Sequence, residues 1–162
     1  MQTKPLTLKI LDVASIIVLA ISTYLALVFA PTEAVMGDVQ RVFYFHIGTA
    51  WVGLVGFVLA AGTGIAYLVT KDMKWDRLEV AAVEVSTIFF FITIVLGSIW
   101  ARPAWNTWWT WDPRLTTAAV TELIYIAFFM LRQGIEDPER RARFGAVYAI
   151  LGGLSAPITF MV

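Results

Sequence analysis

Five long apolar segments constrain the fold of this 162-residue chain more than any other feature of its sequence. Each is close to the roughly 20 residues that an α-helix needs to cross the hydrocarbon core of a bilayer. They lie at about residues 10–30, 42–70, 80–100, 115–131 and 144–162. The sequence therefore predicts an all-α fold, a polytopic helical membrane bundle with five spans.

The composition supports a bilayer as the solvent and excludes several kinds of site. Hydrophobic residues make up 59% of the chain and charged residues 15%, against roughly 25% charged residues in soluble domains. The formal net charge is zero, so nothing indicates a nucleic-acid partner. The chain has no cysteine, which excludes disulfides, thiolate metal sites and thioether attachment of haem. With no internal repeat, residues 1–162 are predicted to form one integral-membrane domain.

The basic residues predict an orientation. Nine of the twelve lie in the N-terminal tail and in the second and fourth connections, and only Arg41, Arg102 and Arg114 lie on the alternate side. Because cytoplasmic loops are enriched in Lys and Arg, we expect a cytoplasmic N-terminus. The connection at residues 100–117 would then face the outside.

That external connection, WNTWWTWDPRLTT, holds four of the seven tryptophans. An aromatic belt at the membrane interface explains one or two such rings, but not four in seven residues. Trp105, Trp108, Trp109 and Asp112 would share one face if the segment were helical. A platform of indoles suits a large, planar, apolar ligand, and the platform would also include Trp111.

The polar residues that follow the tryptophans have a structural explanation and a possible binding role. Asp112 as N-cap and Pro113 at the first helical position form a standard helix start. Arg114 is disfavoured there by the helix dipole, so it is a candidate to meet an anion, with Arg41 and Arg102 as further candidates. Glu122 lies deeper in the span and needs a partner that the sequence does not name.

The only histidine is His46, in VFYFHIGTAW. A single histidine is more often a satisfied polar residue than a ligand. This one lies near the outer end of the second segment, at the depth of the tryptophans, and ionisable residues within spans are functional candidates. Imidazole is a common axial ligand of haem iron, so His46 is the candidate metal ligand.

These residues resemble a known family. WNTWWTWDPRLT is similar to the tryptophan-rich WWD signature of haem-handling proteins, W-G-x-W-W-x-W-D-x-R-L-T. MGDVQRVFYFHIGTAW and ERRARFGAVYAI resemble further segments of the CcmC family of haem exporter C proteins, and the resemblance covers nearly the whole chain.

The resemblance implies a non-enzymatic subunit of System I cytochrome c biogenesis in the cytoplasmic (inner) membrane. Haem b would be held non-covalently, in transit, on the external face and passed to the haem chaperone CcmE. The CcmA/CcmB ABC transporter, which would own any ATPase activity, and CcmD would be partners. The implied haem-binding residues are His46, as axial ligand of the iron, with Trp105, Trp108, Trp109, Trp111, Asp112 and Arg114.

Three features depart from the family pattern. Asn106 stands where the signature usually has glycine, and Gly48 where proline commonly follows the histidine. The family architecture has six helices and a second haem-ligating histidine in a loop after the fifth helix. This sequence ends at Val162, and we expect that loop and helix in a continuation of the chain. The alternative is that the second ligand comes from elsewhere.

Other functions fit the residues less well. The main alternative is a haem- or quinone-binding membrane subunit of a redox complex, which normally places paired histidines within its helices. A transporter would show broken helices and polar residues at the membrane midplane, where only Glu122 qualifies. A purely structural subunit would leave the tryptophans unexplained.

Overall fold

The computed structural model describes residues 4–161, and its described part is built from helices. In chain order these are α1 (Leu6–Tyr24), the short π-helix η1 (Leu25–Phe29), α2 (Gln40–Thr70), α3 (Met73–Trp105), α4 (Pro113–Gly134) and α5 (Pro138–Met161). Five helical segments among the described residues, α1 with η1 and then α2 to α5, are long and apolar enough to cross a membrane. The predicted all-α membrane bundle is confirmed, and the chain is a multi-pass membrane protein.

The helices extend beyond the apolar segments that predicted them. The third was expected at residues 80–100, but α3 begins at Met73 because Asp72 caps it and accepts a hydrogen bond from the backbone N–H of Lys74. The preceding turn is only Lys71 and Asp72, with Lys71 in the left-handed conformation. The polar stretch 71–79 is therefore mostly helix, and the expected loop there was wrong.

The tryptophan connection is also shorter than expected. It was predicted at residues 100–117, but α3 continues through Pro103 to Trp105 and α4 starts at Pro113. The loop proper, called the tryptophan loop below, is residues 106–112. Trp105 thus belongs to the last turn of a helix, although the other three indoles of the cluster are on the loop.

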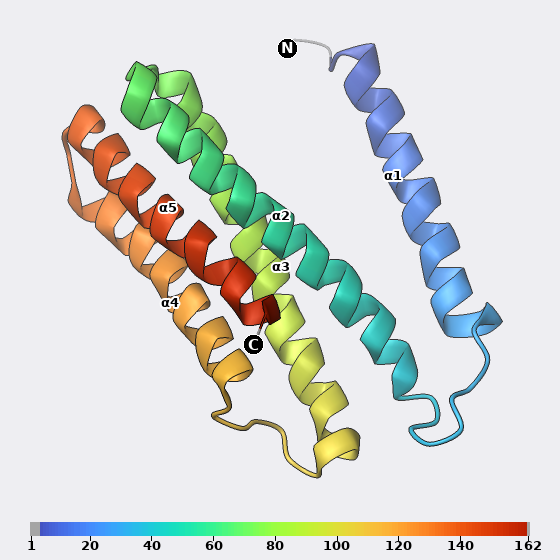
Figure 1. Ribbon diagram of the computed structural model, residues 1–162. Coiled ribbons are helices and arrows are strands. Elements are labelled where there is room, and N and C mark those ends of the chain that lie inside the picture. Colours follow the sequence, from blue (N-terminus) through green and yellow to red (C-terminus); the bar gives the residue numbers. More distant parts are fainter. Residues whose placement is uncertain (1–3, 162) are drawn as a thin grey trace.

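Helices α2 to α5 form the packed bundle, and α1 stands apart from it (Figure 1). The most extensive contacts join α2 to α3, followed by α2 to α5 and α4 to α5. None of the residues of α1 is buried. The core lies where α2, α3, α4 and α5 meet, around Phe57, Phe90, Tyr125 and Ala149.

Small residues let α5 approach its neighbours closely. A Cβ added at Gly153 would lie 2.5 Å from the Cβ of Ala61 on α2, and one at Gly152 would lie 2.4 Å from the ring of Tyr125 on α4. Apolar side chains gain little from leaving lipid, so helices in membranes associate through such close packing of small residues. The same ring of Tyr125 stacks on Phe57 at a centroid distance of 3.9 Å.

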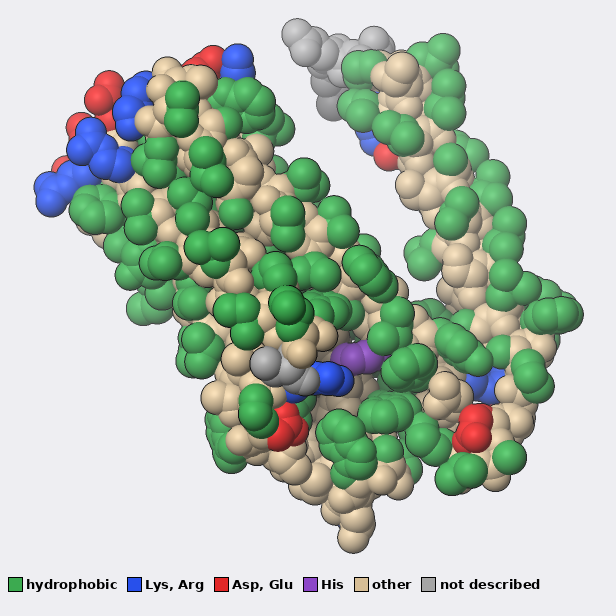
Figure 2. All heavy atoms as spheres, in the orientation of Figure 1, with side chains coloured by type: hydrophobic (Ala, Val, Ile, Leu, Met, Phe, Trp, Pro, Cys, Tyr) green, Lys and Arg blue, Asp and Glu red, His purple; other side chains and the backbone are tan. Residues whose placement is uncertain are grey.

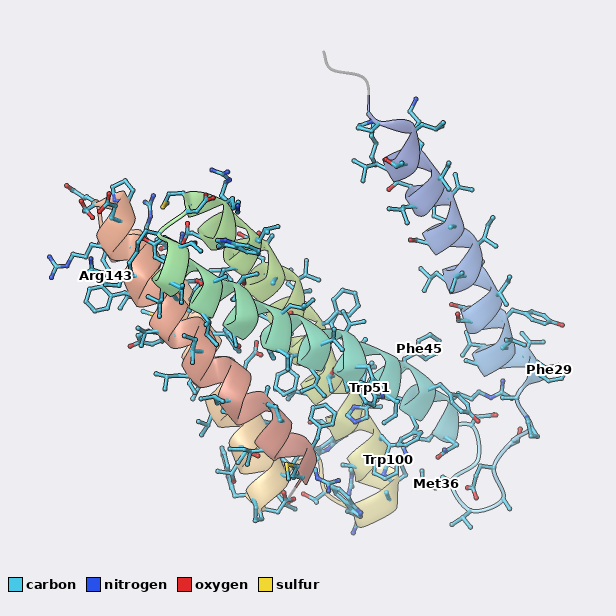
Figure 3. All side chains as sticks on the ribbon, turned by 45° about the horizontal axis from the view of Figure 1, so that its top comes forward. Phe29, Met36, Phe45, Trp51, Trp100 and Arg143 are labelled. Atoms are coloured by element: carbon cyan, nitrogen blue, oxygen red, sulfur yellow. The ribbon has the colours of Figure 1, made fainter. Side chains whose placement is uncertain are left out.

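The bundle has two chemically different ends. The α2–α3 and α4–α5 connections meet at one end, where most charged side chains gather (Figure 2). We call it the basic end, and it carries Arg143 (Figure 3). The tryptophan loop lies at the opposite end, near Trp100 (Figure 3), which we call the tryptophan end.

Candidate functional site

A cavity of about 360 Å³ opens at the tryptophan end of the bundle. Side chains from α2, α3, α4 and α5 line it, and aromatic and aliphatic groups predominate. Four of the predicted site residues are among them: His46, Trp105, Trp108 and Arg114. The fold therefore brings together residues that lie almost 70 positions apart in the sequence.

His46 lies in the second turn of α2 and reaches toward α3. Its Nδ1 is 3.0 Å from the backbone carbonyl oxygen of Thr93. Phe43, one turn earlier on α2, lies beside the imidazole at a centroid distance of 6.3 Å and packs against Trp100 of α3 at 5.7 Å. The histidine is visible at the surface among hydrophobic side chains (Figure 2). The contact with Thr93 thus holds the imidazole at the tryptophan end of the bundle, where it lines the cavity.

The tryptophan loop is irregular, which changes how its indoles are presented. Asn106 ends α3 in the left-handed conformation at φ 56°, and Arg102 donates to its backbone oxygen at 2.6 Å. Residues 106–112 form no helix, so the condition under which Trp105, Trp108, Trp109 and Asp112 would share one helical face is not met. The helical periodicity does not apply across the end of α3.

The four indoles consequently divide into two groups. Trp105 and Trp108 line the cavity and are half exposed, at 51% and 58%. Trp109 and Trp111 are missing from the described lining and meet edge to face at 5.5 Å. Trp111 is 76% exposed. In this arrangement the indoles do not form one continuous flat surface.

Asp112 acts as the helix cap that the sequence indicated. One carboxylate oxygen accepts the hydroxyl of Thr110 at 2.5 Å, and the other accepts the backbone N–H of Leu115 at 2.9 Å. The Thr110 hydroxyl, followed by the backbone N–H groups of Leu115 and Arg114, holds the pKa of Asp112 below its ordinary value. The carboxylate is not among the described groups that line the cavity, so its evident role is to fix the loop to α4.

Of the arginines considered, only Arg114 lines the cavity. Arg41 is paired with Asp38 at 3.0 Å, and Arg102 is bonded to Asn106. Glu122 is buried in α4, and it too is missing from the described lining. Of the three arginines that the sequence offered as partners of an anion, the structure therefore places only Arg114 at the cavity.

Several lining residues were not identified from the sequence. They include Phe43, Thr93, Gly97, Trp100 and Thr159. Phe43 could have been found, because it precedes His46 by three residues and shares its helical face. Thr93, Gly97 and Thr159 carry no sequence signal, since their place at the cavity depends on how α3 and α5 pack against α2.

Comparison with known proteins identifies the family. Residues 1–162 match the CcmC family, described as Heme exporter protein C. The chain belongs to this family. Its CcmC relatives include the Heme exporter protein C of Bradyrhizobium diazoefficiens, 31% identical over 148 residues, and that of Escherichia coli K12, 32% identical over 152 residues. A ccmC-like mitochondrial protein of cytochrome c biosynthesis from Marchantia polymorpha is 28% identical over 139 residues.

These matches cover most of this chain and little more than half of the relatives. The CcmC proteins of B. diazoefficiens and E. coli each match 91% of the chain, and the Marchantia protein matches 86%. The matched regions are 56%, 60% and 58% of the respective relatives. The CcmC resemblance expected from the tryptophan signature is thus confirmed at the level of the family.

Proposed function

We propose that this chain is the haem-holding membrane subunit of a cytochrome c maturation system. The observation that carries the proposal is the cavity at the tryptophan end, which is lined together by His46, Trp105, Trp108 and Arg114. The names of its relatives, which refer to haem export and cytochrome c biosynthesis, support it.

The residues at the cavity fit haem b. Haem is a flat apolar plate with a central iron and two propionates at one edge. The cavity offers the imidazole of His46, which would ligate the iron, and aromatic rings that would contact the plate. Arg114 is the lining group suited to a propionate. The volume of about 360 Å³ lies within the usual range of ligand pockets.

The protein's own residues would bind and orient the haem without reacting with it. The absence of cysteine from residues 1–162 excludes thioether attachment to them, and we propose that the haem would be held non-covalently and could leave. Trp105 and Trp108, which are half exposed, would cover the haem plate from outside. We propose a non-enzymatic subunit that delivers haem to the chaperone CcmE, with CcmD as partner and ATP hydrolysis assigned to CcmA and CcmB.

We further propose that the tryptophan end faces the periplasm and that the N-terminus is cytoplasmic, in the inner membrane. The gathering of Lys and Arg at the opposite end supports this orientation (Figure 2). Single cysteines placed at Asn106 and at Asp137 test it with a membrane-impermeant thiol reagent. Labelling of Asn106→Cys alone in intact cells is expected. Labelling of Asp137→Cys alone would show that the orientation is opposite to the one proposed.

The test of haem binding is the absorption spectrum of the purified protein. We expect a Soret band that shifts in His46→Ala, because the iron loses one axial ligand. Trp51→Ala is a matched control, since Trp51 is an exposed aromatic residue on the same helix and does not appear among the described lining residues. An identical spectrum for His46→Ala and the wild type would overturn the proposed ligand.

A further inference from the structure

The contact between His46 and α3 fixes the hydrogen on the imidazole ring. Nδ1 lies 3.0 Å from the carbonyl oxygen of Thr93, and a carbonyl oxygen can only accept a hydrogen bond. Nδ1 must therefore carry the hydrogen. In a neutral imidazole the lone pair then belongs to Nε2. Neutral imidazole in water prefers the opposite tautomer, with hydrogen on Nε2, so this contact acts against the intrinsic preference of the side chain.

The ring can reach Thr93 because the residue one turn further along α3 is glycine. A Cβ at Gly97 would lie 3.0 Å from Cε1 of His46 and 3.2 Å from Nδ1. Both distances are shorter than ordinary van der Waals contact, so a methyl group there would push the ring away from the carbonyl. Gly97 thus has a steric reason to be glycine that its helical backbone does not provide.

A second contact holds the two helices in register at this point. The hydroxyl of Thr93 donates to the hydroxyl of Thr49 at 2.9 Å. Thr49 follows His46 by three residues on α2, and its own hydroxyl donates to the backbone oxygens of Phe45 and His46. The pair therefore joins α2 to α3 one turn from the histidine.

We propose that Thr93 and Gly97, together with the Thr49–Thr93 pair, are positioning residues for iron ligation by His46. They keep Nδ1 in its hydrogen bond to the Thr93 carbonyl oxygen, so that the Nε2 lone pair is available to a ligand in the cavity. Metal-binding histidines are commonly oriented through a hydrogen bond from the other ring nitrogen. The ligand in this inference rests on the proposed function, but the tautomer is a property of the ligand-free protein.

The decisive measurement is the ¹⁵N NMR spectrum of the imidazole in the ligand-free chain. His46 is the only histidine of residues 1–162, so ¹⁵N-histidine labelling of this chain gives a single ring when the affinity tag contains no histidine. The spectrum is recorded in detergent micelles near pH 8, above the ordinary histidine pKa of about 6.5. We expect a protonated Nδ1 and an unprotonated Nε2. A ring protonated mainly on Nε2 would overturn the proposal.

Two alanine variants separate positioning from simple helix packing. Gly97→Ala is expected to reduce the population protonated on Nδ1, and Gly48→Ala is the matched control. A Cβ at Gly48, also close to His46, would meet no atom within 4 Å. Thr93→Val keeps the backbone carbonyl and replaces only the hydroxyl with a methyl group, so we expect a smaller change in the Nδ1-protonated population than in Gly97→Ala. Wild-type imidazole signals in a folded Gly97→Ala protein would contradict the role assigned to Gly97.

Haem titration then separates this inference from the proposed function. We expect Gly97→Ala to bind haem about tenfold more weakly, at the lower end of the effects seen when such orienting contacts are lost, and Gly48→Ala to bind like the wild type. Failure of the wild type to bind haem, with Nδ1 protonated as expected, would overturn the proposed function alone. Normal haem binding through His46 by a ring protonated on Nε2 would overturn the positioning inference alone.

Discussion

The basic end and the tryptophan end of the α2–α5 bundle differ in how closely their helices pack. At the basic end, Arg132 of α4 donates to both carboxylate oxygens of Asp76 on α3, at 2.6 and 3.1 Å. Fully buried Glu79 lies close to the same guanidinium, since a Cβ at Gly145 would be 2.6 Å from Arg132 and 3.0 Å from Glu79. At the tryptophan end, the helices leave a cavity of about 360 Å³.

The difference shows how one bundle can combine a closely packed end with an end that has room for a ligand. Charged groups of α3 and α4 pair with one another at the basic end, and a Cβ at Gly64 of α2 or at Gly145 of α5 would lie within 3.0 Å of a neighbouring side chain. Large rings at the tryptophan end remain half exposed, and the buried hydroxyl of Thr159 and indole N–H of Trp100 have no hydrogen-bond partner among the described residues. The first end should therefore control stability, and the second should control ligand binding.

The largest expected effect comes from breaking the ion pair at the basic end. Arg132→Ala would leave buried Asp76 without its cation, which typically lowers the free energy of unfolding by about 3–5 kcal/mol. Denaturant titration in micelles, followed by circular dichroism, measures it. The matched control is Lys74→Ala, which removes the exposed pair between Lys74 and Asp72 at 3.0 Å and should change little. Equal stability of the two variants would show that the ion pair does not hold this end together.

The stability of the basic end could not have been inferred from the sequence, although the spans could. Long apolar segments predict membrane helices directly, because bilayer thickness sets their length. Asp76 and Glu79 lie in a polar stretch that resembles a loop, and only the packing of α3 against α4 and α5 shows that they are buried. Hydropathy records the composition of a segment but not its neighbours.

The candidate site was predictable in part for a similar reason. His46 and the tryptophan cluster are visible in the sequence, since a single histidine and four nearby indoles are unusual on the same side of a membrane. The sequence did not show that Trp105 and Trp108 line the cavity while Trp109 and Trp111 pack against each other. This division depends on where α3 ends, and Asn106 in its left-handed conformation sets that point.

A smaller effect, confined to the tryptophan end, tests that division. Trp108→Ala removes a ring from the cavity lining and should weaken haem binding by about 1–3 kcal/mol, by analogy with base stacking on aromatic side chains. Haem affinity would then fall roughly fivefold to roughly 150-fold. Trp111→Ala removes a more exposed indole that is not among the described lining residues, and haem affinity should be unchanged. A larger loss in Trp111→Ala would mean that the indoles rearrange around haem.

The smallest expected effect is at Glu122, which belongs to neither end. It lies ten residues after the Asp112 cap, about 15 Å along α4, and its Oε2 is buried without a hydrogen-bond partner among the described residues. Glu122→Gln keeps the shape of the side chain and removes its capacity to be charged, and the residue is not among those described at the cavity. Haem content and Soret maximum should therefore match the wild type. Loss of haem at normal protein levels would mean that the haem site extends from the tryptophan end into the middle of the bundle, and the separation of the two ends would fail.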